Sequence, residues 1–222
     1  DPLSQATIGA AAAQSVTKKA DLARIGLIGA LAGMAPDLDV LIQSSTDPLL
    51  QLEYHRQFTH SLVFIPFGAL LCAIAFWSFV RHHMNLRAIW LIALAGYATH
   101  GLLDACTTYG TLLLWPLSDA RIAWNTISVV DPLFTLPLLG FVIAAGVKKS
   151  HFIGRLGMAW VAFYLSIGVV QEERARAAGE ALAAQRGHAP AVVSAKPSFG
   201  NLLLWKTVYE YEDEFWVDAV RA

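Results

Sequence analysis

The sequence predicts an all-α integral membrane helix bundle of about six helices, the first two of them short, followed by a small C-terminal β-hairpin. Hydrophobic residues make up 56% of the chain and charged residues only 15%, whereas soluble domains carry about 25% charged residues. Four apolar runs approach the ~20 residues that a helix needs to cross a bilayer. They cover residues 61–80, 86–103, 132–147 and 153–170.

Two shorter segments precede these runs. Residues 2–17 are rich in alanine, and residues 25–36 combine glycine with leucine, isoleucine and alanine. Both segments are short for membrane spans, but small side chains allow helices to pack closely. We therefore expect a helical hairpin buried among the longer helices, followed by a connecting loop over residues 40–60.

The third and fourth apolar runs are bounded by turn signals. Asp131 followed by Pro132 is typical of a helix N-cap with proline in the first turn, so we expect a structural role for Asp131. Tight basic turns over residues 81–87 and 148–155 connect the paired runs. A long loop with several aromatic residues, which favour the membrane interface, covers residues 105–131.

The composition changes after residue 170. Residues 171–186 are charged and alanine-rich, which predicts a helix that leaves the membrane and ends near Gly187. Residues 187–200 contain two prolines and are expected to form a linker. Residues 202–211 and 215–220 are rich in β-branched and aromatic residues, which predicts a β-hairpin. The expected division is a helical domain over 1–170, a helix and linker over 171–200, and a hairpin over 201–222 that packs on the helical domain or begins a longer soluble domain.

Basic residues divide unevenly between the two ends of the predicted spans. The turns over residues 18–24, 81–87 and 148–155 contain eight lysines and arginines, whereas the opposite loops contain only Arg56 and Arg121. Because basic residues collect on the cytoplasmic side, we expect the opposite loops and the C-terminal tail to be extracytoplasmic. The net charge of −1 and the lack of a basic block give no indication of nucleic-acid binding.

Three pairs of histidine or aspartate residues lie at the extracytoplasmic ends of predicted helices. They are Asp37 and Asp39, His55 and His60, and His100 and Asp104. His100 and Asp104 are four residues apart, so on a helix they share one face. Asp37 and Asp39 follow Pro36, and an extended backbone there would turn both carboxylates to the same side. We expect the three pairs to meet at one metal site.

The ligand types in these pairs favour a borderline transition metal. Three imidazoles and three carboxylates suit one or two divalent ions, with zinc expected first and manganese or iron as alternatives. Such an ion lowers the pKa of bound water toward ~7. Arg56, between His55 and His60, is expected to bind an anion through its guanidinium group, and Glu53 is expected to act as a general base. No Gly-x-Ser-x-Gly element indicates serine-hydrolase chemistry.

Each of these pairs also fits a purely structural role. The two histidines before residue 61 could cap a helix at the membrane interface, the pair on the 86–103 run could form a buried hydrogen bond, and the aspartates after Pro36 could be solvated. Ionisable residues within membrane segments are functional sites by default, which favours the metal site. A non-enzymatic metal-binding scaffold or partner-binding anchor is the alternative to an enzyme. A transporter is disfavoured, because transporters place their ligands near the midplane.

These motifs occur in the same order in a known family. The chain resembles the bacterial and archaeal family of LexA-binding, inner membrane-associated hydrolases, also described as membrane-bound metal-dependent hydrolases. The resemblance covers most of residues 1–170, and its most specific part is the His-Arg-x-x-Thr-His-Ser element. It is carried by Asp1-Pro2-Leu3-Ser4-Gln5, Pro36-Asp37-Leu38-Asp39, His55-Arg56-Gln57-Phe58-Thr59-His60-Ser61, His100-Gly101-Leu102-Leu103-Asp104 and Asp131-Pro132-Leu133-Phe134.

The resemblance implies a metal-dependent hydrolase in the bacterial or archaeal cytoplasmic (inner) membrane. That family is grouped with zinc-dependent phospholipase C enzymes, whose zinc ligands include a His-x-x-x-Asp pair. The ligands implied by the resemblance are Asp37, Asp39, His55, His60, His100 and Asp104. The expected substrate is a membrane phospholipid or another lipid-linked phosphoester. Residues 112–115 are expected to guide its acyl chain. The C-terminal tail is the expected contact for any protein partner.

Overall fold

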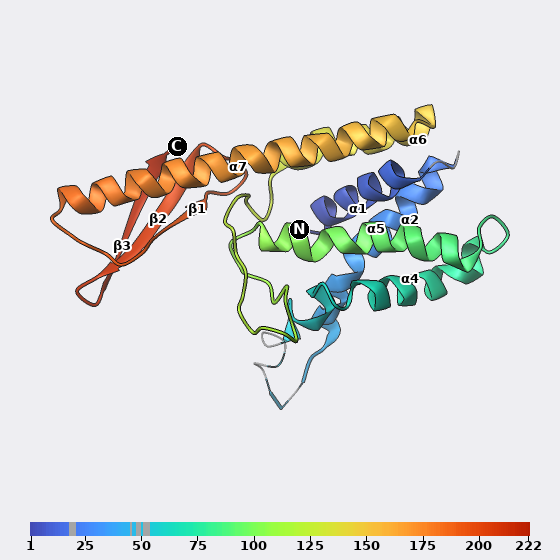
Figure 1. Cartoon of the computed structure of the whole chain (residues 1–222), viewed down its shortest axis with the longest axis horizontal. Coiled ribbons are helices and arrows are strands. Elements are labelled where there is room, and N and C mark those ends of the chain that lie inside the picture. Colours follow the sequence, from blue (N-terminus) through green and yellow to red (C-terminus); the bar gives the residue numbers. More distant parts are fainter. Residues whose placement is uncertain (18–20, 45, 48–49, 51–53) are drawn as a thin grey trace.

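The structure is a computed structural model that describes residues 1–17, 21–44, 46–47, 50 and 54–222. Within these residues a helix bundle precedes a three-stranded sheet. The elements are α1 (Pro2–Val16), α2 (Leu22–Met34), the 3-10 helices η1 (Ala35–Leu41) and η2 (Phe58–His60), α4 (Ile65–Val80), α5 (Leu86–Ala105), α6 (Pro132–Lys148), α7 (His151–Gln185), β1 (Val193–Pro197), β2 (Leu204–Tyr211) and β3 (Glu214–Arg221). Figure 1 shows α7 continuing beyond the bundle to carry the sheet.

The outer surface of the bundle is strongly apolar. Among the described residues, two helices are long and apolar enough to cross a membrane, α5 with 20 residues and α7 with 35. α4 and α6 are also apolar, with 16 and 17 residues. Large apolar side chains are exposed on α4 and α6, for example Phe67 (60%), Phe79 (81%) and Ile143 (56%). Soluble monomers rarely expose large contiguous apolar patches, so this surface suits a hydrocarbon environment.

The short helices α1 and α2 form the expected hairpin and pack against α5. An added Cβ at Gly9 would lie 2.5 Å from the carbonyl oxygen of Gly29, and a Cβ at Gly96 would collide with the same oxygen. The three backbones approach so closely because these positions lack side chains. Buried positions of α1 extend from Ser4 to Gln14, which confirms the prediction of a buried short helix.

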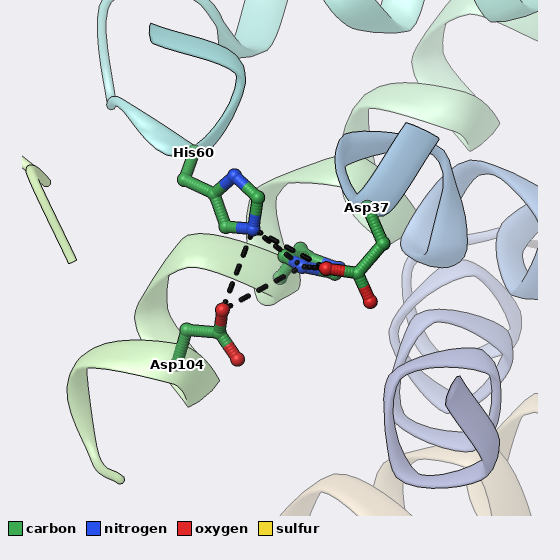
Figure 2. A group of neighbouring side chains, drawn as sticks. Asp37, His60 and Asp104 are labelled. Carbon is green, nitrogen blue, oxygen red and sulfur yellow. Dashed lines mark hydrogen bonds and ion pairs between the residues drawn. The ribbon is translucent and has the colours of Figure 1, made fainter. Parts of the chain in front are cut away.

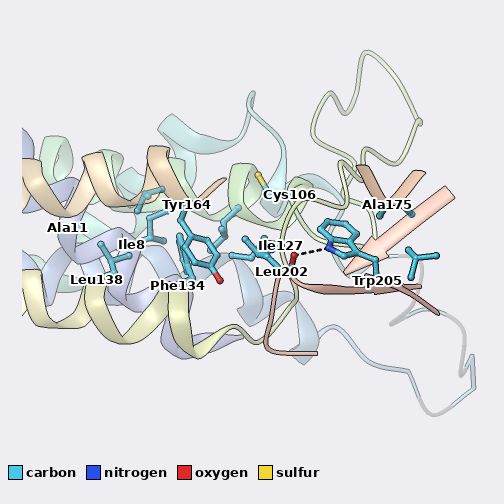
Figure 3. Close-up of a cluster of buried hydrophobic side chains, with 14 residues drawn as sticks. Ile8, Ala11, Cys106, Ile127, Phe134, Leu138, Tyr164, Ala175, Leu202 and Trp205 are labelled. Carbon is cyan, nitrogen blue, oxygen red and sulfur yellow. Dashed lines mark hydrogen bonds between the residues drawn. The ribbon is translucent and has the colours of Figure 1, made fainter. Parts of the chain in front are cut away.

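One apolar core joins the helix bundle to the sheet. It includes Ile8 of α1, Phe134 and Leu138 of α6, Tyr164 of α7 and Trp205 of β2. Figure 3 shows Ile8, Leu138, Phe134 and Tyr164 toward one end of this cluster and Trp205 toward the other. The sheet is therefore packed on the helices. This packing stabilises it, because an isolated hairpin is only marginally stable in water.

The sheet has the strand order β1-β2-β3, and both pairings are antiparallel. β2 and β3 are the predicted hairpin. The prediction of a linker over residues 187–200 is wrong in part, because Val193–Pro197 pairs with β2 as β1. Val193 and Ala195 are buried at alternate positions, as in a strand with one covered face. Pro197 ends this strand, a place where proline is tolerated.

Helix α7 runs without a break from the predicted span into the predicted extramembrane helix. It ends at Gln185, just before Gly187, whose φ is +77°, as the sequence predicts. Near its middle the side-chain amide of Gln171 donates to the carbonyl oxygens of Leu202 (3.0 Å) and Ala222 (3.1 Å). These two hydrogen bonds attach both ends of the β2–β3 hairpin to the helix.

We predict that Gly29→Ala destabilises the bundle and that Gly140→Ala does not. A Cβ at Gly29 would lie 2.5 Å from the carbonyl oxygen of Gly9, and overpacking of this kind costs about 1–3 kcal/mol. A Cβ at Gly140 meets nothing within 4 Å, and alanine there favours the helix by up to about 1 kcal/mol. Thermal unfolding in one detergent measures both variants. Equal melting temperatures would contradict the close packing of α1, α2 and α5.

Candidate metal centre

Four of the predicted ligands meet beside the last turns of α5. Asp37 comes from η1, His60 from the end of η2, and His100 and Asp104 from one face of α5. One ligand atom of each lies within 4.8 Å of the others. Figure 2 shows Asp37, His60 and Asp104 pointing toward one another from these separate elements. Residues 61–64 form turns instead of the start of the predicted 61–80 helix, and α4 begins only at Ile65.

The two imidazoles approach each other through nitrogens that carry lone pairs. Nδ1 of His100 lies 2.5 Å from the carbonyl oxygen of Gly33 and must donate to it. The hydroxyl of Thr59 donates to Asp39 Oδ2 (3.0 Å), so it accepts from Nδ1 of His60 (2.9 Å). With both N–H groups used in this way, the neutral rings have only acceptors at Nε2. These two Nε2 atoms are 2.9 Å apart, and a cation between them is needed to remove their repulsion.

Asp104 adds a buried carboxylate oxygen to the same point. Its Oδ1 accepts a hydrogen bond from the side-chain amide of Gln5 at 2.9 Å. Its Oδ2 is buried and receives no hydrogen bond from the described residues. It lies 3.4 Å from Nε2 of His60 and forms an ion pair with Nε of Arg56 at 3.2 Å. Oδ1 of Asp37 lies 3.2 Å from Nε2 of His100 on the other side. Buried polar atoms without hydrogen bonds are costly, and a divalent ion would satisfy all four of these ligand atoms together.

The residues therefore fit a metal ion of the predicted class. Two imidazole nitrogens and two carboxylate oxygens are ligands that zinc takes in a tetrahedral arrangement, and manganese or iron also accepts them. His60, His100 and Asp104 are almost fully buried, with exposed fractions of 2%, 0% and 3%. The side chain of Asp37 is 31% exposed, so the centre opens to its surroundings at Asp37.

The electrostatic field of the cluster favours positive charge. Burial works against the ionised form of Asp37, but the imidazoles of His100 and His60 hold the pKa of its carboxyl well below the usual range. Burial likewise opposes ionisation of Asp39, yet its contacts with His60 and His55 lower its pKa to about 2. Around His60, the carboxylates outweigh burial and raise the pKa of the imidazole to about 10. A proton or a metal ion between the imidazoles is stabilised by the same carboxylates.

Asp39 and His55 form an outer layer around the four clustered residues. Asp39 faces Nδ1 of His60 (3.3 Å) and Nδ1 of His55 (2.8 Å). A carboxylate behind a ligating histidine orients the ring and raises its basicity. The predicted extended backbone at residues 37–39 is wrong: η1 is a 3-10 helix. Three residues per turn direct Asp37 and Asp39 toward different atoms of the site.

Arg56 is buried beside the cluster. Its Nε lies 3.2 Å from Oδ2 of Asp104, and its guanidinium lies over the ring of Tyr109, 5.2 Å from the centroid. Its backbone N–H, at a φ of 62°, donates to Oδ2 of Asp39 at 3.0 Å. Arg56 thus contacts Asp104 of the cluster through its side chain and Asp39 of the outer layer through its backbone. Its role as an anion clamp stays a prediction. Glu53, the predicted general base, lies outside the described residues.

Two further residues support the ligands. Thr59, which the sequence motif offers for a hydrogen bond beside His60, fixes the tautomer of that ring, and Gln5, which sequence reasoning missed, holds Asp104 from α1. The signal for Gln5 was an amide side chain in an alanine-rich helix, since a buried amide needs a partner. Asp131 caps α6 as predicted, accepting from the backbone nitrogens of Leu133 and Phe134. Asp1 caps α1 in the same way.

Comparison with known proteins places this site in a membrane family. Residues 1–175 match the family model described as YdjM inner membrane protein. The chain belongs to the YdjM inner membrane protein family. All four clustered residues lie within the matched region of this family member, and the sheet lies beyond it. The predicted inner-membrane setting is thereby confirmed, whereas hydrolase activity stays a prediction.

Two curated relatives extend this match. The chain is 34% identical over 146 residues to Inner membrane protein YbcI of Escherichia coli (strain K12), covering 62% of this chain and 83% of that protein. It is 27% identical over 145 residues to Uncharacterized protein YfhP of Bacillus subtilis (strain 168), covering 65% of this chain and 42% of that protein. The match thus spans less than half of the Bacillus relative. No solved structure matches.

We predict that the purified protein binds about one zinc ion through this cluster. His100→Ala removes a ligand and abolishes stoichiometric binding. Asp39→Asn removes the carboxylate behind His60 but none of the four clustered ligands, so it weakens binding about 10–100-fold. His82→Ala, in the turn between α4 and α5, is the control and leaves binding unchanged. Elemental analysis and competition with a metal indicator measure these effects, and full zinc occupancy in His100→Ala would contradict the assignment.

Proposed function

We propose that this protein is a multi-pass inner-membrane hydrolase that uses a divalent metal, zinc first, to cleave a phosphoester of a lipid or lipid-linked substrate. The observation that carries the proposal is the pair of Nε2 atoms of His60 and His100, which lie 2.9 Å apart while Nδ1 of each ring is held by another partner. Beside them lies the buried Oδ2 of Asp104. A divalent ion bound there would polarise the phosphoryl group and lower the pKa of attacking water toward ~7.

The position of the site along α5 supports a substrate taken from the membrane. At about 1.5 Å per residue, His100 lies about 8 Å before the end of α5. η1 and η2 fold back beside this part of the helix. Non-helical backbone at membrane depth is tolerated where it is buried in protein or lines a cavity. A site built in this way suits a phosphate group attached to an anchored lipid better than a freely soluble ester.

The arrangement of the turns supports the proposed orientation. Figure 1 shows the α4–α5 and α6–α7 turns at the end of the bundle opposite to the long loop that follows α5. Arg81, Arg87, Lys148 and Lys149 lie at the turn end. By the positive-inside rule this end is cytoplasmic, so the metal centre and the sheet are proposed to be extracytoplasmic.

The chain's own residues divide the catalytic tasks in this proposal. Asp37, the exposed member of the cluster, is placed to accept a proton from water that approaches the open side. His60 and His100 are held in fixed tautomers by Thr59 and Gly33. Preorganised groups of this kind need no rearrangement during the reaction.

A non-enzymatic metal-binding scaffold is the second candidate. Four protein ligands are typical of structural zinc sites, whereas catalytic sites usually keep one position open. The exposure of Asp37 favours the enzyme, because a carboxylate at the open side can give up its position to water. The effect of an Asp37 substitution on metal binding and on activity therefore distinguishes the enzyme from the scaffold.

We predict that Asp37→Asn retains the metal and loses most phosphodiesterase activity. Wild-type protein in lipid nanodiscs is expected to cleave a phospholipid from a broad panel, with the released phosphate monoester or diacylglycerol measured by mass spectrometry. A chelator should abolish cleavage, added zinc should restore it, and His60→Ala should lose both metal and activity. His82→Ala is the control with unchanged activity. Full metal occupancy of the wild type without turnover on any substrate would support the scaffold instead.

A further inference from the structure

An apolar groove lies on the outer face of the bundle, next to the metal centre. It has a volume of about 630 Å³ and is lined mainly by α2, η1 and α4, with contributions from η2 and α5. Its walls include Leu31, Met34, Leu38, Leu71, Cys72 and Phe76. The side chains of Leu38 and Leu71 are more than half exposed, at 63% and 62%, so the groove is open along the surface that faces lipid in the proposed topology.

The polar side chains that line this groove are neighbours of the metal centre. They are Asp39, Thr59 and Tyr97. The hydroxyl of Tyr97 donates to the carbonyl oxygen of Thr59 at 2.9 Å. Asp39 and Thr59 are the two residues that contact Nδ1 of His60. The apolar groove therefore runs directly into the residues that orient a proposed metal ligand.

We propose that this groove holds one acyl chain of a phospholipid whose phosphate is presented to the metal centre; this inference rests on the function proposed above. A volume of about 630 Å³ falls within the ~300–1,000 Å³ of sites for small ligands. A helix of a partner protein is about 10–12 Å across and would need a broader surface. The apolar walls and the one connected group of polar side chains match the two parts of a lipid.

This assignment replaces in part the acyl-chain guide predicted from the sequence over residues 112–115. Leu112 and Leu113 are buried, with exposed fractions of 7% and 4%, whereas Leu114 is 42% exposed. The backbone nitrogen of Leu112 donates to the carbonyl oxygen of Arg56 at 3.0 Å, so this segment supports the site from within. In this proposal the open groove along α4 holds the acyl chain.

Photocrosslinking tests the groove without requiring catalysis. The protein is placed in nanodiscs that contain a phosphatidylglycerol with a diazirine in one acyl chain, and labelled peptides are mapped after irradiation. We expect labelling to concentrate on the peptides that contain Met34, Leu38, Cys72 and Phe76. Ala75→Trp fills the groove and should reduce this labelling several-fold. Leu38→Trp, at an exposed position on the other wall, is the second variant if Ala75→Trp does not fold.

A second apolar groove provides the matched control. It has a volume of about 540 Å³, lies between α1, α2 and α6, and is lined in part by Ala23. It does not include any of the four clustered residues of the metal centre. Ala23→Trp should leave labelling of the α4 groove unchanged. Uniform labelling of all apolar helices, unaffected by Ala75→Trp or Leu38→Trp, would overturn the proposal.

Hydrolysis assays separate failure of the groove from failure of the proposed function. Loss of groove labelling in Ala75→Trp, with no hydrolysis by any variant, would support a lipid-binding groove and contradict the enzyme. Hydrolysis of long-chain phospholipid that Ala75→Trp leaves intact, together with uniform labelling, would support the enzyme and overturn the groove. Recovery of a crosslinked protein instead of lipid at these peptides would also overturn the acyl-chain assignment.

Discussion

The contact between Nε2 of His60 and Nε2 of His100 is the constraint around which the metal centre is built. Each ring has donated its other N–H, one to Thr59 and one to the carbonyl oxygen of Gly33. Two acceptors 2.9 Å apart repel each other in a buried site unless positive charge lies between them. The carboxylates of Asp37 and Asp104 add negative charge at the same point, and together these groups define a cation site.

The fold holds this contact through close packing of helix backbones. Gly33 can offer its carbonyl oxygen to His100 because glycines in α1, α2 and α5 allow the three helices to touch. Gly101 likewise allows a close approach of α5 to the backbone at His60, since a Cβ there would collide with the carbonyl oxygen of His60. The short first hairpin is thus part of the site and not only a membrane anchor. The sheet is attached on the far side of the core, through Trp205 and Leu202.

Part of this arrangement could be predicted from the sequence. The spacing of His100 and Asp104 and their place at the end of an apolar run indicated their shared face, and the other two clustered residues, Asp37 and His60, come from the other two predicted pairs. The outer position of Asp39 could not be predicted, because it depends on η1 being a 3-10 helix. The contact between Gln5 and Asp104 joins residues 99 positions apart, and such pairs follow from tertiary packing. β1 was missed because Pro190, before the strand, and Pro197, at its end, resemble the prolines of a linker, although the alternate burial of Val193 and Ala195 stabilises a strand.

The central claim is that one metal ion is held by the imidazoles of His60 and His100 together with carboxylate oxygens. X-ray absorption at the zinc K-edge of the zinc-loaded protein measures this ligand set directly. We predict two imidazole nitrogens at about 2.0–2.1 Å, carboxylate oxygens at about 2.0–2.2 Å and no sulfur. His60→Ala should lose one imidazole from the spectrum. A sulfur ligand at about 2.3 Å, or a shell without imidazole, would contradict the claim.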